Sequence, residues 1–294
     1  MSPGSVLLSW DGRDERGGVV PNEAYFVRLR LLDGRKKTLS AFDPLAGPGR
    51  NRESPEDVTY SSADGILTYS LARPGRVHVE AGQAPLDPIT KTRTGPVLKV
   101  IVDREPRPAG RILERWDGWD ESRTIFVPEL TDMVFSVVAT PLPDGAILAT
   151  GNRDRTFLDY APARPPRRHE DGAPSPVLNA LEDRAPRMSL QALVPYDAAA
   201  KRYVADGDLT VRVELDPARA AHFVSQPTEV QLFLDHERIL TAVRPSNPAQ
   251  LVVDSAKLPS GEHRLAVNWF SKLGPATVNA IRLYVPEKTR KASK

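Results

Sequence analysis

Two acidic clusters, each beside a tryptophan and a glycine, have residue types and spacing suited to chemistry. The first holds Trp10, Asp11, Gly12 and Asp14, and the second holds Trp116, Asp117, Gly118 and Asp120. Carboxylates this close together are suited to a calcium loop or to the acid pair of glycoside hydrolysis. The spacing lacks the D-x-[DN]-x-[DN]-G pattern of calcium loops, and an arginine interrupts the first cluster. Because the same spacing occurs twice, we favour a structural turn: aspartate accepts backbone N–H bonds, glycine permits the turn, and tryptophan plugs the end of a β-sandwich.

Other catalytic or metal-binding patterns are not seen in the sequence. The histidines fall on separate expected elements without HxH or HExxH spacing: His78, His169, His222, His236 and His263. The chain has no cysteine, which removes disulfides and thiolate chemistry, and it has no Gly-x-Ser-x-Gly elbow, P-loop or dinucleotide fingerprint. The sequence therefore predicts a protein that is not an enzyme and holds no cofactor or metal. An unrecognised hydrolase is the alternative, and it would need a concave pocket with perturbed carboxylates.

Composition points to an all-β chain with more than one core. The 294 residues include 28 prolines and 19 glycines, which disfavour long helices and suit short strands joined by turns. Forty basic residues against 38 acidic ones give a net charge of +2, so nucleic acid is not the expected partner. No run approaches the roughly 20 apolar residues of a membrane-spanning helix, and residues 1–14 lack the features of a signal peptide.

Strand patterns divide the chain into segments. Residues 5–10 and 23–32 are expected to form a hairpin, and a Pro-rich stretch over 41–58 reads as a loop. About six strands between 61 and 151 predict a sandwich, and seven more between 189 and 285 predict an immunoglobulin-like one. The predicted division is 1–58 for a partial hairpin and its linker, 59–160 for the first sandwich, 161–187 for a Pro/Arg linker, 188–286 for the second sandwich, and 287–294 for a basic tail.

The two tryptophan motifs belong to an internal repeat with a period of about one domain. The second copy and its surroundings resemble the immunoglobulin-like domain of the flagellar hook-capping protein (FlgD-type). The residues that carry the likeness are Tyr69 to Leu71, Val77, Val79, Leu98 to Asp103, Pro108 to Gly110 and Trp116 to Asp120. The copy at Trp10 carries only the closing part of the pattern, in Trp10 to Asp14 and Tyr25 to Leu29. The resemblance implies one half copy over about 1–40 and one fuller copy over about 61–150, with no catalytic role for the motif.

A half-domain leaves a core face that must be covered. We expect residues 1–40 to pack on the second copy, on residues 150–160 or on another protein. Candidate partner contacts are Trp119 and the linker arginines Arg164, Arg167 and Arg168, although a solvated connector is the favoured interpretation of that linker.

These observations predict a non-enzymatic structural or accessory subunit. It would bind protein subunits of a larger bacterial envelope assembly: an appendage, a surface layer, or the periplasmic face of a membrane complex such as a respiratory or photosynthetic one. The expected location is exported, periplasmic or on the cell surface, peripheral to a membrane at most. The alternative is a carbohydrate-binding or accessory module of a secreted hydrolase, for which Trp119 and Trp269 are the candidate aromatics.

Overall fold

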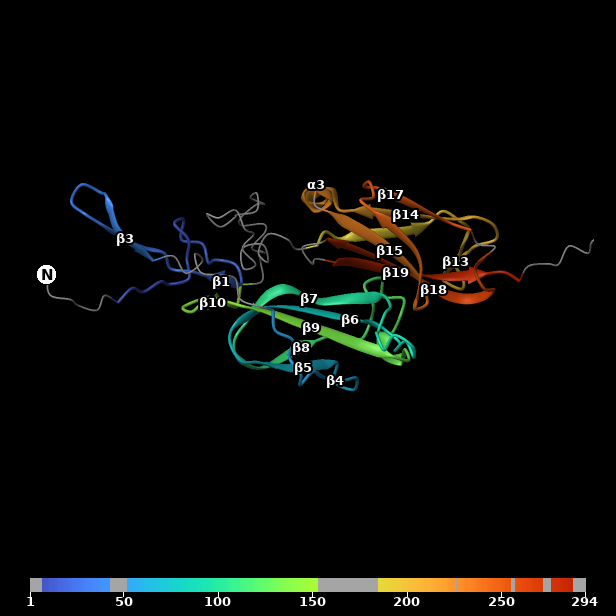
Figure 1. Cartoon of the computed structure of the whole chain (residues 1–294), viewed down its shortest axis with the longest axis horizontal. Helices are drawn as coiled ribbons and strands as arrows, with labels where there is room; N and C mark the ends of the chain where they lie inside the picture. The colour runs from blue at the N-terminus through green and yellow to red at the C-terminus, as the bar shows by residue number, and fades with distance from the viewer. Residues whose placement is uncertain are drawn as a thin grey trace, which may run out of the picture.

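The chain forms an all-β structure made of two β-sandwiches and an N-terminal half-domain (Figure 1). The computed structural model describes residues 7–42, 52–152, 185–225, 227–254, 257–271 and 276–287. The predicted all-β, immunoglobulin-like class is confirmed. No helix within these ranges is long and apolar enough to cross a membrane. The predicted linker over 161–187 lies outside the described residues except for its last three, and with it lie Arg164, Arg167 and Arg168.

The half-domain, residues 7–42, has three short strands: β1 (Glu23–Tyr25), β2 (Leu29–Leu32) and β3 (Thr38–Phe42). Two sequence predictions were wrong here. Residues 7–10 form no strand, and the strand expected over 23–32 is split in two. The split has a tertiary cause, because β1 pairs with β10 of the first sandwich whereas β2 pairs with β3.

The first sandwich consists of two three-stranded antiparallel sheets, β4-β5-β8 and β7-β6-β9. The same stretch of chain also contains the 3-10 helix η1 and the short strand β10. In chain order, the elements are β4 (Thr59–Ser61), β5 (Ile66–Leu71), β6 (Gly75–Gln83), β7 (Val97–Arg107), β8 (Gly110–Arg115), η1 (Val127–Glu129), β9 (Met133–Pro141) and β10 (Ile147–Ala149). Alternating apolar side chains of β5 and β6, such as Leu67, Tyr69, Val77 and Val79, are fully buried between the sheets. This burial explains why strand periodicity was visible in the sequence.

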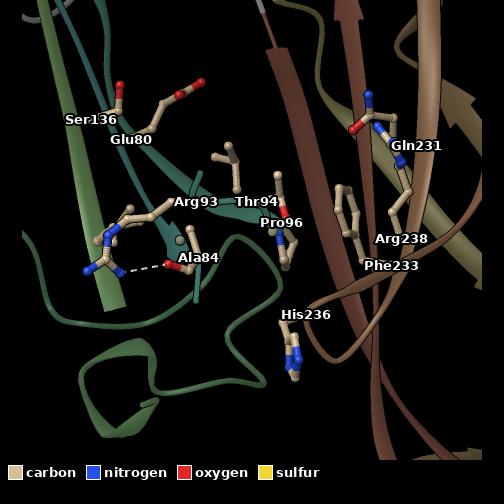
Figure 2. A pocket seen from close by; sticks show the side chains of 15 residues that line it. Glu80, Ala84, Arg93, Thr94, Pro96, Ser136, Gln231, Phe233, His236 and Arg238 are labelled. Atoms are coloured by element: carbon tan, nitrogen blue, oxygen red, sulfur yellow. Dashed lines mark hydrogen bonds between the residues drawn. The ribbon is translucent and has the colours of Figure 1, made fainter. Parts of the chain in front are cut away.

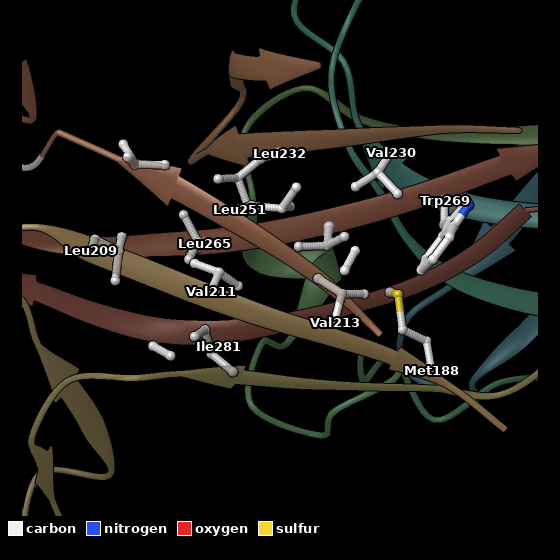
Figure 3. Close-up of a cluster of buried hydrophobic side chains, with 14 of the residues drawn as sticks. Met188, Leu209, Val211, Val213, Val230, Leu232, Leu251, Leu265, Trp269 and Ile281 are labelled. Atoms are coloured by element: carbon white, nitrogen blue, oxygen red, sulfur yellow. The ribbon is translucent and has the colours of Figure 1, made fainter. Parts of the chain in front are cut away.

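The second sandwich packs a three-stranded sheet, β11-β14-β17, on a six-stranded sheet, β12-β13-β19-β18-β15-β16. The strands are β11 (Met188–Ala192), β12 (Tyr196–Asp197), β13 (Arg202–Val204), β14 (Leu209–Leu215), β15 (Thr228–Leu234), β16 (Glu237–Val243), β17 (Ala249–Val253), β18 (Gly261–Ser271) and β19 (Ala276–Val285). Figure 3 shows their buried side chains between the sheets.

The sequence prediction missed β12, β13 and the helix α3 (Pro217–Ser225). The helix starts at a proline, whose fixed φ and missing N–H suit a first helical position. Ala220 and Phe223 of this helix join the core of the second sandwich. The proline count that argued against long helices therefore did not exclude a short one.

The two sandwiches lie against each other over a buried contact. Trp116 and Ile125 of the first form a cluster with Phe233, Ala266 and Ala280 of the second. In Figure 1, β7 and β6 face the sheet that holds β18 and β19.

Polar contacts fix the register of that interface. The side-chain amide of Asn268 accepts a hydrogen bond from Val97 N at 2.8 Å and donates one to Val97 O at 2.6 Å. Asn268 is fully buried. Arg264 donates to the side-chain oxygen of Gln83, and Arg282 donates to the carbonyl of Thr124. Because Asn268 satisfies the edge of β7 as a neighbouring strand would, the sandwiches are joined by specific hydrogen bonds as well as by apolar area.

Candidate interaction surface

The Trp116 motif is a hydrogen-bonded turn. The indole N–H of Trp116 donates to the carbonyl of Trp119 at 2.9 Å, and Asp117 accepts from the backbone N–H of Trp119 at 3.2 Å. Asp120, 1% exposed, accepts from the backbone N–H groups of Thr124 and Ile125 at 2.7 and 2.8 Å. Its carboxylate is therefore occupied by the loop that it closes.

Gly118 is required in this turn for two reasons. Its φ is +82°, in the left-handed region, and a Cβ at this position would lie 2.4 Å from the ring of Phe126.

The Trp10 motif repeats the same contacts. Trp10 donates to the carbonyl of Arg13 at 2.7 Å, Asp11 accepts from the N–H of Arg13 at 3.0 Å, and Asp14 accepts from the N–H groups of Arg16 and Gly18. The turn closes alike in both copies, by Val20 N–H on the carbonyl of Gly12 and by Val127 N–H on the carbonyl of Gly118. The internal sequence repeat thus corresponds to the same set of hydrogen bonds formed in both turns. Among the described residues, no group of three histidine or acidic side chains is arranged to hold a metal ion.

The two tryptophans differ in burial. Trp116 is 5% exposed and packs on Tyr60 and Phe135. Trp10 is 42% exposed and meets the ring of Tyr25 edge-on. The expectation that each tryptophan plugs the end of a sandwich is therefore wrong for Trp10, which no second sheet covers in the part of the chain that the structure describes.

The half-domain is fastened to the first sandwich at its base. Strand β1 pairs with β10, and the side-chain amide of Asn152 donates to the carbonyls of Val19 and Val20. Glu23 of β1 forms an ion pair with Arg76 of β6 at 2.6 Å, and both side chains are 1% exposed. Two of the three expected coverings contribute to this attachment: the second copy through β10 and Arg76, and residues 150–160 through Asn152.

Beyond its base, the half-domain carries the β2–β3 hairpin, which projects away from both sandwiches (Figure 1). Leu29, Leu31 and Leu32 of β2 are 46%, 61% and 48% exposed. The sheet contains only β2 and β3, so one backbone edge of each strand has no strand beside it within the described residues. The hairpin combines an exposed apolar strand with open backbone edges.

The hairpin is also basic. Arg30 lies between the leucines, and Arg35, Lys36 and Lys37 are exposed at and after the turn. The acidic residue Asp33 is used within the turn, where it accepts the N–H groups of Arg35 and Lys37. This surface therefore combines exposed leucines, open backbone edges and positive charge.

A cleft of about 320 Å³ opens where the two sandwiches meet (Figure 2). Phe233 and Pro96 line its apolar part, while Arg93, His236 and Arg238 bring exposed positive or titratable groups to it. Arg93 is engaged locally, since its guanidinium donates to the carbonyl of Ala84 at 2.9 Å. Residues of both sandwiches line this cleft, so neither sandwich alone would form it.

His78 on β6 lies between two carboxylates, a cluster that the sequence analysis missed. Its Nε2 is 2.9 Å from Glu80, and its Nδ1 is 3.4 Å from Asp103 of β7, in an ion pair without good hydrogen-bond geometry. Burial alone would lower the pKa of His78, but the two carboxylates outweigh burial and raise it to about 9. The His-x-Glu spacing of a strand, which puts both side chains on one face, was the available signal.

The aromatic candidates for carbohydrate binding are not arranged as a strip. Trp269 is fully buried in the second sandwich (Figure 3), so it cannot serve as one of the two candidate aromatics of the carbohydrate-binding alternative. Trp119 is half-buried and packs on Phe126 at a centroid distance of 5.4 Å. Of the other histidines, His236 is exposed, and His263 bonds to Asp235 and to the carbonyl of Pro259; His169 is outside the described residues.

Comparison with known proteins gives no family. No protein-family model matches the chain, and no curated protein sequence matches it. Among solved structures, the fibronectin(III)-like modules of Clostridium thermocellum CbhA are 10% identical, with a TM-score of 0.24 over 83% of this chain and 100% of that chain. The extracellular domain of a putative one-component system from B. thetaiotaomicron is 11% identical, with a TM-score of 0.28 over 97% of this chain and 31% of that chain.

An endo-β-1,4-mannanase from Thermotoga petrophila is 12% identical, with a TM-score of 0.26 over 43% of this chain and 30% of that chain. The present chain thus spans less than a third of the mannanase and of that extracellular domain. Scores and identities this low support no inference about function.

Proposed function

We propose that this chain is a non-enzymatic accessory subunit that binds other proteins in a larger bacterial envelope assembly. That assembly is an appendage, a surface structure, or the periplasmic face of a membrane complex, with respiratory and photosynthetic complexes included. The observation that carries the proposal is the β2–β3 hairpin, because an exposed apolar strand with open edges is costly to keep in water without a partner.

The attachment of the half-domain at its base supports the same function. Glu23 and Arg76 lock β1 to the first sandwich, and Asn268 locks the first sandwich to the second. A fixed base holds the hairpin out from the sandwiches, where a partner can reach it (Figure 1).

The buried acids and bases of the described residues support a binding role over a catalytic one. Asp120 closes a turn, Glu23 neutralises Arg76, and His78 joins β6 to β7. The likeness of residues 1–40 and 61–150 to FlgD-type domains supports an exported location, since such domains recur in exported bacterial proteins. A module of a secreted hydrolase is the competing proposal, and it has lost Trp269 as a contact residue.

Gentle detergent extraction of the tagged chain from its source organism tests the proposal. We expect the chain to migrate as a stoichiometric complex in native separation, with partners identified by mass spectrometry. A monodisperse free monomer would count against the accessory-subunit function. Glycan-array binding that is lost in Trp119→Ala would instead establish the carbohydrate-binding alternative.

A further inference from the structure

The complete copy of the repeat shows what the half-domain lacks. After the Trp116 turn the chain enters β9, which pairs with β6 along its whole length from Met133 to Pro141. After the Trp10 turn the chain enters β1 and β2, and β2 has only β3 beside it. Within the described residues, no strand takes the place beside β2 that β6 takes beside β9.

The open edge of β2 favours a polypeptide over a lipid surface. Unpaired backbone N–H and C=O groups on a strand edge are satisfied by another strand and not by hydrocarbon. The exposed leucines lie along β2, whereas the tip of the hairpin carries Arg35, Lys36 and Lys37. A hairpin that inserted its tip into a bilayer would therefore bury its charges first.

The charge of the hairpin favours an acidic partner over a second copy. Between residues 27 and 42 the sequence has five basic residues and one acidic residue. Two such hairpins paired edge to edge would bring like charges together, which destabilises neighbouring strands. An incoming strand with acidic side chains would pair with Arg30 and with the basic residues of the turn.

We propose that the β2–β3 hairpin is a strand-addition site for an extended acidic segment of a partner protein. Apolar residues of that segment cover Leu29 and Leu31, and alternating aspartate or glutamate residues reach the basic side chains. This inference rests on the proposed function and names how the partner is held.

Photo-crosslinking in the full chain locates the contact. A photoreactive residue replaces Leu31 in one variant and Leu113 in another; both leucines are 61% exposed, but Leu113 lies on β8 of the first sandwich. In the source organism, we expect position 31, and not position 113, to capture a segment in which apolar residues alternate with acidic ones. No crosslink at position 31, or capture of a second copy or of lipid, would overturn the inference.

The captured segment is then synthesised and added to the purified full chain. We expect hydrogen exchange of β2 amides to slow, and Leu31→Asp to weaken binding by at least about tenfold while Leu113→Asp leaves it unchanged. Vesicles rich in phosphatidylglycerol should not bind the chain. Binding to these vesicles that Leu31→Asp removes, or an unchanged affinity for the peptide in Leu31→Asp, would contradict strand addition.

Different experimental outcomes would contradict strand addition at the hairpin and the proposed accessory function. If Leu31→Asp still enters the stoichiometric complex as the unaltered chain does, the accessory function stands and the hairpin is not its contact. If the unaltered chain is itself recovered alone, the accessory function is wrong.

Discussion

At the scale of single residues, the Glu23–Arg76 ion pair carries the most consequence for stability. The pair is buried on both sides and joins elements more than 50 positions apart in sequence. Removing one member of a buried pair leaves the other charge uncompensated, which usually costs about 3–5 kcal/mol. Exposed pairs contribute under about 1 kcal/mol.

We expect Arg76→Met to lower the free energy of unfolding by about 3–5 kcal/mol in urea titrations and to release the half-domain to proteolysis. Arg73→Met is the matched control, because the Arg73–Glu53 pair is about half exposed and should change stability by less than about 1 kcal/mol. Equal effects of the two substitutions would show that the buried pair does not fasten the half-domain.

Asp120 and Asp14 have the same role, each in its own copy of the turn, but they differ in burial. Asp120→Ala leaves the N–H groups of Thr124 and Ile125 without their acceptor in a buried loop, so we expect a loss of about 2–3 kcal/mol. Asp14→Ala leaves donors that water can reach, so the loss should be under about 1 kcal/mol. Thermal or urea unfolding of both variants measures the difference, and a larger loss for Asp14→Ala would contradict this account.

At the scale of elements, the His78 cluster connects β6 to β7 and to the start of the second sandwich. Asp103, the ion-pair partner of His78, also accepts the backbone N–H of Ala185 at 3.3 Å. The imidazolium therefore stabilises a carboxylate at the point where the chain enters the second sandwich.

This cluster predicts a pH dependence. The pKa of His78 is raised from 6.5 to about 9, so protonation favours the folded state. The stabilisation is complete below about pH 6.5 and is lost as pH rises through about 9. In urea unfolding at a series of pH values, we expect the stability advantage of the unaltered chain over His78→Gln to shrink between pH 6.5 and 10. In Glu80→Gln the loss should be complete at a lower pH, and a constant advantage across this range would refute the role of the imidazolium.

At the scale of the whole molecule, the interface between the sandwiches makes them one body. Phe233, Ala266 and Ala280 bury apolar surface against the first sandwich, and Asn268 supplies two hydrogen bonds to Val97. Apolar contact alone would let one sandwich slide against the other, whereas a buried amide that is bonded to one backbone position prevents this movement.

We expect Asn268→Leu to uncouple the sandwiches, because the N–H and C=O of the half-buried Val97 would lose their partners. Calorimetry should then resolve two unfolding transitions where the unaltered chain gives one. Asn279→Leu is the control, since Asn279 bonds to the carbonyl of Met188 within the second sandwich. A single transition in Asn268→Leu would mean that apolar burial suffices to couple the two sandwiches.

The sequence by itself determined the local features of this protein. Alternating apolar residues in β5, β6 and β14 predicted strands because burial between two sheets imposes a period of two. The repeat of Trp-Asp-Gly-x-Asp was readable because all its hydrogen bonds lie within a few residues of each tryptophan. Contacts this close in sequence are specified by residue type and spacing.

Tertiary structure alone decided the rest. The break between β1 and β2, the exposure of Trp10, the burial of Trp269 and the His78–Asp103 contact depend on strands that meet from distant parts of the chain. Pairing between distant strands is set by which faces and edges remain free after local structure has formed, and single-residue patterns do not encode that choice. For the same reason, the open edges of the β2–β3 sheet follow from the strand pairing and not from the sequence pattern.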